Sequence, residues 1–104
     1  MKVIKERVSG DVMVLEDTLL QGIVTGKVCV ARGANLMHHG MIVGPVTLEP
    51  GAEASIFGFV KGDVVNKGGD LRVYGTVNGA VKTEAGSTRI DKDAFIRQEE
   101  NLTH

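Results

Sequence analysis

The chain has little aromatic material and little proline. Among its 104 residues there is no tryptophan, one tyrosine and three phenylalanines, so a core built around large rings is not expected. The chain contains only two prolines but fourteen glycines. That balance favours a chain with many tight turns over a disordered one.

Disulfides, a membrane span and a strong net charge are also missing. Cys29 is the only cysteine, so it has no partner for an internal disulfide, which fits a reducing compartment. Residues 1–7 contain no apolar run of the length that a signal peptide or membrane span needs. Twelve basic and thirteen acidic side chains give a formal net charge of −1. We therefore expect a single cytoplasmic domain, with no nucleic-acid partner and no strong attraction to a membrane.

A glycine–valine repeat runs through the chain. Residues 58–64 read Gly-x-Val-x-Gly-x-Val, and related segments begin at Gly22, Gly40 and Gly75. The first glycines of these segments are 18, 18 and 17 residues apart. Between the glycines lie short runs in which apolar and polar residues alternate, the pattern of a β-strand. Repeats of this length, with three short strands each, predict a coil.

The predicted fold is all-β: a single-domain parallel β-helix in which each turn pairs only with its neighbours. The second glycine of each motif recurs at intervals of 16 to 18 residues, which gives about five to six turns. We place the β-helix at residues 8–96. Residues 1–7 are an N-terminal segment that could cap the coil, and residues 97–104 are a polar C-terminal tail.

Stacking of the turns sorts the residues into columns, each holding the equivalent position of every turn. Five columns are almost wholly aliphatic, and we assign them to the interior. Their members are Val12, Val28, Val46, Val64 and Val81; Val14, Val30, Leu48, Asn66 and Thr83; Val24, Ile42, Val60 and Val77; Leu36, Ala54, Leu71 and Thr88; Leu20, His38, Ile56, Val73 and Ile90.

The same alignment turns several large apolar side chains outward along one edge. A monomer has no reason to expose most of its large apolar residues, so we interpret this ridge as a surface for self-association or for a protein partner. The ridge consists of Leu19, Ile23, Met37, His39, Met41, Phe57, Phe59 and Tyr74. At the two ends of the coil we expect contacts from Val3, Ile4, Phe95 and Ile96.

No set of residues predicts catalysis or metal binding. His38 and His39 are adjacent on a strand and point to opposite faces, so they do not readily share one metal ion. No base has a position beside Cys29 that the sequence implies, and neither phosphate-binding glycine motif is present. We expect no cofactor and no enzymatic activity.

The repeats resemble those of the bactofilins, a family of polymer-forming bacterial cytoskeletal proteins. The resemblance rests on residues 58–64, 66–79 and 85–90, and it covers roughly residues 8–96. It implies a right-handed β-helix, a choice of hand that the columns alone do not make. It also implies polymerisation end to end through the terminal turns, without nucleotide. The chain departs from the family in lacking long proline-rich tails and a short apolar targeting segment at its start.

Two alternatives stay open beside a self-assembling scaffold. A small binding protein, such as a toxin-immunity protein, would use the ridge to dock one partner. A left-handed hexapeptide-repeat enzyme is suggested by aliphatic residues at six-residue intervals from Val24 to Val60. The hexad weakens at Asn66, and turns of 16 and 17 residues interrupt it. The favoured prediction is a non-enzymatic scaffold that forms homo-oligomers or polymers.

Overall fold

The fold is a solenoid made only of β-strands. The computed structural model describes the backbone of residues 1–101 and the side chains of residues 1–97, and this part of the chain contains no helix. All strand pairs are parallel. The strands are β1 (Lys2–Ile4), β2 (Arg7–Val8), β3 (Val12–Val14), β4 (Thr18–Leu20), β5 (Ile23–Val24), β6 (Val28–Val30), β7 (Asn35–His38), β8 (Met41–Ile42), β9 (Val46–Leu48), β10 (Glu53–Ile56), β11 (Phe59–Val60), β12 (Val64–Val73), β13 (Thr76–Ile90) and β14 (Phe95–Asn101).

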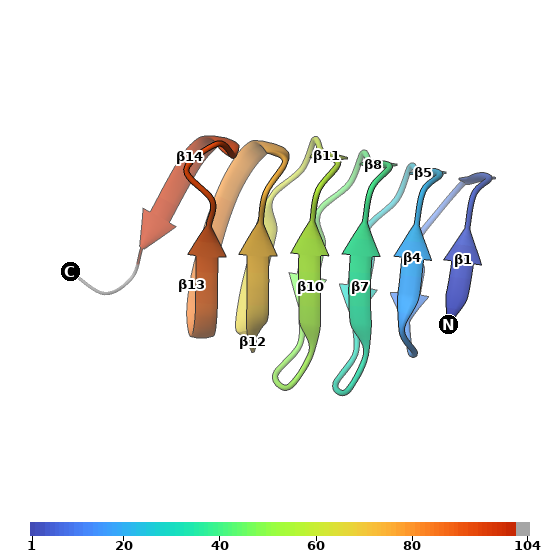
Figure 1. The fold of residues 1–104 in the computed structure, drawn as a ribbon, viewed down its shortest axis with the longest axis horizontal. Coiled ribbons are helices and arrows are strands. Elements are labelled where there is room, and N and C mark those ends of the chain that lie inside the picture. The colour runs from blue at the N-terminus through green and yellow to red at the C-terminus, as the bar shows by residue number, and fades with distance from the viewer. Residues whose placement is uncertain (102–104) are drawn as a thin grey trace.

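The strands form three faces around one axis, and each face is a sheet of parallel strands (Figure 1). The first face is β1-β4-β7-β10-β12-β13, the second is β2-β5-β8-β11-β13-β14, and the third is β3-β6-β9-β12-β13-β14. The long strands β12 and β13 bend around corners and so serve more than one face. Along the first face, paired positions are 16, 18, 18, 17 and 17 residues apart. The predicted parallel β-helix, with its period and number of turns, is confirmed.

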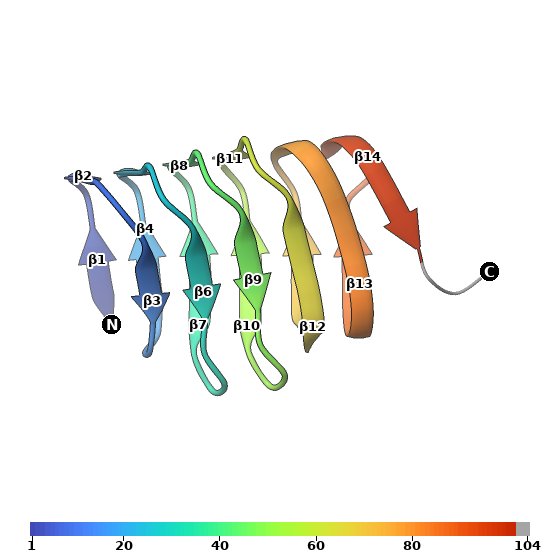
Figure 2. The same cartoon turned by 180° about the vertical axis from the view of Figure 1, so that it is seen from behind.

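The coil is right-handed. In Figure 1 the strands of the front face point upward while the chain advances from right to left. Figure 2 shows the same coil from behind, where β3, β6 and β9 point downward. A chain that runs up the front, down the back and onward from right to left forms a right-handed coil. Parallel crossover connections have this hand almost without exception.

The core is a narrow aliphatic stack. All five predicted interior columns occur in the register that the sequence analysis gave them; one runs Val12, Val28, Val46, Val64 and Val81. Most of their aliphatic members are fully buried. Each buried valine, leucine or isoleucine contributes roughly 1.5–3 kcal/mol of transfer free energy. Many medium-sized side chains thus replace the few large rings that the sequence lacks.

Stacked glycines close the corner between the first and second faces. A Cβ atom on Gly40 would overlap the carbonyl oxygen of Gly22, and one on Gly58 would overlap that of Gly40. Gly75 has the same relation to Gly58. None of these glycines has a positive φ. Close approach of successive turns therefore explains the first glycine of each motif, because a side chain there would push the turns apart.

The coil extends beyond the predicted limits of residues 8–96. β1 pairs with β4, and β2 pairs with β5, so residues 2–8 belong to the first turn of the coil and are not a separate cap. β14 pairs with β13 and continues to Asn101, into the segment predicted to be a polar tail. Residues 102–104 lie outside the described part of the chain.

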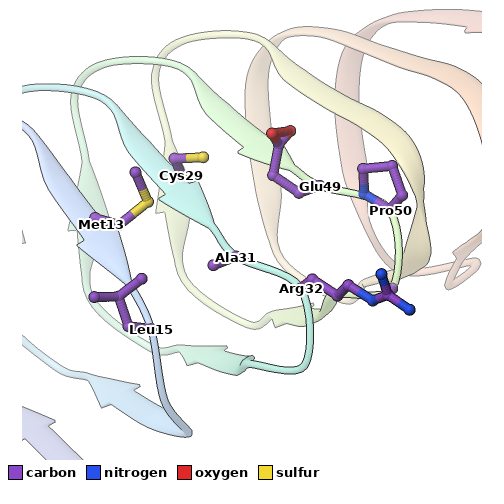
Figure 3. A pocket seen from close by; sticks show the side chains of 8 residues that line it. Met13, Leu15, Cys29, Ala31, Arg32, Glu49 and Pro50 are labelled. Atoms are coloured by element: carbon purple, nitrogen blue, oxygen red, sulfur yellow. The ribbon is translucent and has the colours of Figure 1, made fainter.

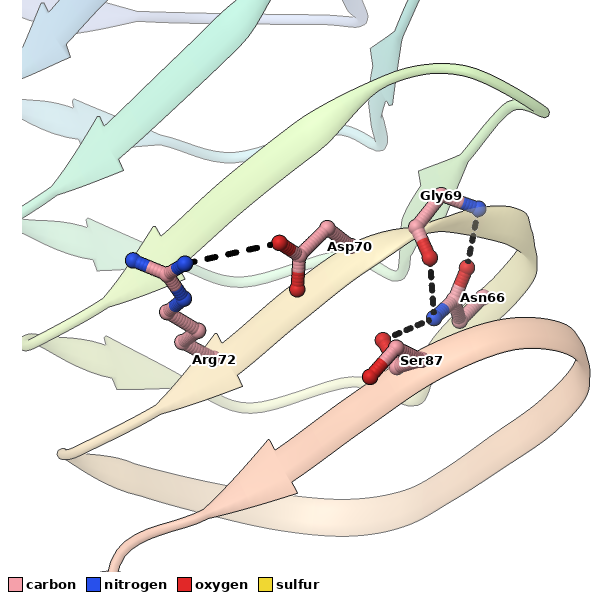
Figure 4. A network of polar contacts seen from close by, with 5 residues as sticks. All are labelled: Asn66, Gly69, Asp70, Arg72 and Ser87. Carbon is pink, nitrogen blue, oxygen red and sulfur yellow. Dashed lines mark hydrogen bonds and ion pairs between the residues drawn. The ribbon is translucent and has the colours of Figure 1, made fainter.

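A polar network interrupts the core at Asn66, which is fully buried (Figure 4). Its Oδ1 accepts hydrogen bonds from the amides of Gly68 at 3.1 Å and Gly69 at 2.7 Å. Its Nδ2 donates to the carbonyls of Gly69 at 3.2 Å and Ser87 at 2.9 Å, and to Thr88 Oγ1 at 3.0 Å. The single side chain thus satisfies the backbone of its own corner and ties it to the next turn.

Removal of this side chain tests the network. Asn66→Ala leaves two amides without their acceptor, one of them in a buried glycine, and we expect a loss of about 3 kcal/mol in unfolding free energy. The measurement is urea unfolding followed by circular dichroism. Asn78→Ala, on an outward position of β13, is the matched control and should change the free energy by less than about 0.5 kcal/mol. Equal losses in the two variants would contradict the role given to Asn66.

Candidate association surface

The eight predicted ridge residues line the corner between the first and second faces. Leu19 pairs with Met37 on the first face, and Ile23, Met41 and Phe59 are in register on the second. His39, Phe57 and Tyr74 follow the last residues of β7, β10 and β12, at the corner itself. The structure therefore places all eight side chains on one continuous edge, over the second to fifth turns.

Three ring side chains stack along this corner. The rings of His39 and Phe57 are 4.7 Å apart between centroids and inclined by 5°. The rings of Phe57 and Tyr74 are 4.8 Å apart and inclined by 8°. Both spacings match the distance between neighbouring strands, so the backbone repeat itself sets the stack.

The ridge remains open to solvent although it is apolar. Phe57 and Tyr74 are each 42% exposed, Ile23 is 40% exposed and Met37 is 38% exposed. Leu19, Met41 and Phe59 are half-buried. Contiguous apolar surface of this kind marks sites of protein association more often than it marks an ordinary surface.

The four predicted end residues divide into two pairs. Ile4 is 7% exposed and Ile96 packs partly buried against the core, so both point inward. Val3 and Phe95 point outward and are 44% and 60% exposed. The four residues predicted to make end contacts thus belong to the first and last turns. Ile4 and Ile96 extend the core by one position, and Val3 and Phe95 extend the outer surface by one position.

His38 is buried directly behind the ridge, in the interior column of Leu20 and Ile56. Its Nε2 lies 3.0 Å from the carbonyl oxygen of Phe59, and its Nδ1 has no hydrogen-bond partner. Burial lowers the pKa of His38, because a charged imidazolium in an aliphatic core is poorly solvated; the Phe59 carbonyl opposes this shift. The neutral ring with its proton on Nε2 fits these surroundings.

A second apolar surface, which the sequence reasoning missed, is a groove on the other side of the coil (Figure 3). Met13 is 58% exposed and Leu15 is 73% exposed. The groove has a volume of about 760 Å³ and is lined by Met13, Leu15, Cys29, Ala31, Arg32, Glu49, Pro50 and Gly51.

A short corner in the first turn creates this groove. Three residues separate Val14 from Thr18, whereas five separate the paired positions Val30 and Leu36. The loops before β7 and β10 therefore project beyond the first turn, as Figure 1 shows. The 16-residue interval between the first two turns was the only signal of this feature in the sequence.

Cys29 lies half-buried in the wall of the groove. Burial raises the pKa of its thiol, and the nearby carboxylate of Glu49 raises it further. The thiol is therefore protonated at neutral pH and is a poor nucleophile.

The described side chains, those of residues 1–97, include no group of histidine, cysteine, aspartate and glutamate that could hold a metal ion. Within the same part of the chain there is no helix of the length and apolarity that crossing a membrane requires.

The buried histidine predicts a pH-dependent stability. Because the pKa of His38 is lower in the folded chain than its ordinary value of 6.5, its stabilising contribution is complete above that value and is lost as the pH falls toward the folded pKa. The unfolding free energy should decrease between pH 7 and pH 5. His38→Leu should flatten this dependence, and His39→Leu is the control that should keep it. Identical pH dependence in wild type and His38→Leu would contradict this assignment.

Comparison of the chain with protein-family models, curated proteins and solved structures yields no match.

Proposed function

We propose that this chain is a non-enzymatic structural protein that assembles end to end into a polymer. One observation carries the proposal: both terminal turns present strand edges that no other described strand covers. β1, β2 and β3 each pair only with the following turn. At the other end, nothing in the described residues pairs with the outer edge of β14. Open edges of this kind are templates for pairing with another chain.

The first turn shows which groups are free. The Lys2 amide donates a hydrogen bond to the Asp17 carbonyl, and the Val12 amide donates one to the Lys27 carbonyl. Both acceptors lie within the coil. Backbone groups alternate in direction along a parallel strand, so the amide and carbonyl of Val3 and Met13 face away from the coil. A second copy could continue the ladder through these groups.

The core is also open at the ends. Val8 and Val12 in the first turn are only partly buried, as are Ile90 and Ile96 in the last. The equivalent residues of the middle turns are fully buried. A stacked copy would bury these end residues, and this apolar contact would stabilise the joint in addition to the backbone ladder.

Two further features support the proposal. The resemblance of the repeats to bactofilins implies a polymer built from such joints. The ridge offers a second, lateral surface through which polymers or monomers could associate. An interior that is filled with matched aliphatic columns suits a stiff scaffold better than a binding cavity.

Proline at the free edge tests the end-to-end joint. Val3→Pro combined with Met13→Pro removes two outward amides and no hydrogen bond of the coil, so the fold should remain. Light scattering across a concentration series should show growth for wild type and at least tenfold less scattered intensity at the highest concentration for the proline variant. Val3→Ala combined with Met13→Ala is the control and should still grow. Growth that is unaffected by the prolines would refute the joint.

A charge on the ridge tests the lateral contact separately. Phe57→Asp places a carboxylate between His39 and Tyr74, and desolvating it in an apolar interface is costly. Lateral association should weaken at least tenfold while end-to-end growth persists, as measured by sedimentation velocity. Thr47→Asp, on an outward position of the third face, is the control. If Phe57→Asp unfolds the chain, the side chain is structural; if lateral association is unchanged, the ridge serves another partner.

A further inference from the structure

We infer that the end-to-end joint is head to tail, so that the first turn of one copy stacks on the last turn of the next copy. This inference rests on the proposed polymer and names which of its two ends meet. It follows from one charged residue at each end of the coil, because each of the two occupies a column that forms the core in the middle turns.

Lys2 is the charged residue at the first end. It is in register with Thr18, and Thr18 is in register with the buried Leu36, so Lys2 occupies an interior column although it is exposed. Its side chain lines a pit of about 90 Å³ together with Ile4 and Val12. The pit lies where the core opens at the first turn. A copy stacked on this turn would therefore cover the side chain of Lys2.

Lys2 forms no ion pair with the side chains that the structure describes. Glu16 lines the same pit, but the only ion pair among residues 1–97 joins Arg72 to Asp70. Covering an ammonium group without an opposite charge is costly, because the group loses its water and gains no partner. The copy that covers this end should therefore bring an anion.

Glu99 is the charged residue at the other end. β14 is in register with β13, and this register aligns Glu99 with Val81 and Asn101 with Thr83. Val81 belongs to the column that begins with Val12 and is buried in the middle turns. Position 99 thus continues an interior column with an acidic residue, in the last described turn.

Only a joint between unlike ends brings these two charges together. If two first turns met, two copies of Lys2 would share one small core, and if two last turns met, two copies of Glu99 would share it. Both arrangements bury like charges, however the copies are rotated about the coil axis. Head-to-tail stacking instead places Lys2 of one copy and Glu99 of the other in adjacent layers of the core.

The interior at this end is narrow and polar. Thr83 on the third face and Thr88 on the first face lie 2.7 Å apart between their hydroxyl oxygens, so side chains of these two faces meet across the core. In a head-to-tail joint Lys2 would lie between Thr88 of one copy and Thr18 of its own. Their hydroxyl oxygens and the carboxylate of Glu99 would replace the water that the ammonium group loses.

The other two interior columns at the joint are apolar at both ends. In the same register Ile4 would follow Ile90 of the neighbouring copy, and Val8 would follow Ile96. The core columns would therefore run on from one copy into the next. This apolar contact supplies affinity, and the charged pair selects which ends meet.

Two outward columns agree with head-to-tail stacking. Lys5 and Asp91 each follow the last interior residue of the first face, so Lys5 of one copy would lie one strand away from Asp91 of the other. Arg7 and Phe95 begin and end one column of the second face, and both are exposed. At the joint the guanidinium group would lie beside the ring, a favourable cation–π contact.

Disulfide trapping tests which ends meet. In a Cys29→Ser background, Val3→Cys and Arg89→Cys are prepared as separate proteins, one of them isotopically labelled. The two positions begin and end one outward column. A head-to-tail joint places them on adjacent strands about 4.8 Å apart, a separation that a disulfide spans.

Under mild oxidation the mixture should yield at least fivefold more cross-linked heterodimer than either protein alone yields homodimer, as measured by mass spectrometry. The Cys29→Ser chain without new thiols is the control and should grow without cross-links. Homodimers without enrichment of the heterodimer, or no cross-link in a growing polymer, would overturn the inference.

Charge reversal gives an independent readout without new thiols. Lys2→Glu alone and Glu99→Lys alone each leave two like charges in every head-to-tail joint, so scattered intensity at the highest concentration should fall at least tenfold. The double variant restores opposite charges and should regain growth. Lys82→Glu, on an outward position of the third face, is the control and should grow as wild type does. Single variants that grow normally, or a double variant that does not recover, would refute the joint.

Growth of the wild-type chain separates this inference from the proposed polymer. If wild type grows and neither test gives its expected result, the head-to-tail joint is wrong and an end-to-end polymer of another polarity remains. If wild type stays discrete at every concentration, the polymer is wrong, and the joint is wrong with it.

Discussion

The fold depends on the parallel backbone ladder between equivalent positions of successive turns. Each turn is too small to bury its own apolar residues, so its stability comes from the turn before and the turn after. The ladder forces every residue to lie directly against its counterpart one turn away. Only residue types that can pack against similar residues of the next turn suit this arrangement. The aliphatic columns and the stacked glycines satisfy that condition.

The same constraint shapes the surface. The spacing that packs Val28 on Val46 inside also places His39, Phe57 and Tyr74 at stacking distance outside. An apolar residue that recurs at one outward position therefore becomes a continuous ridge. Among the described strands, those of the first and last turns have a neighbouring turn on one side only, so their outer edges are left without a partner strand.

Much of this architecture could be predicted from the sequence, because the spacing of a repeat indicates which residues of successive turns lie side by side. The glycine spacing located the turns, and the alternation of apolar residues located the interior columns. Features that belong to one turn alone carried no such signal. The strand at Lys2–Ile4 lacks the glycine motif, so the sequence indicates only an N-terminal segment that could cap the coil. The groove at Met13 and Leu15 depends on a corner two residues shorter than the next, for which the 16-residue interval between the first two turns is the only sign in the sequence. The repeat predicts the column of Asn66, but its bonds to Gly69 and Ser87 depend on how the corner bends in three dimensions.

Electron microscopy of the negatively stained wild-type protein tests the central claim most directly. Stacked six-turn coils with strands about 4.8 Å apart predict thin filaments with an axial repeat of roughly 29 Å per copy. Filaments one or two coils wide with that repeat would support the account. Discrete particles of uniform size at every protein concentration would contradict it.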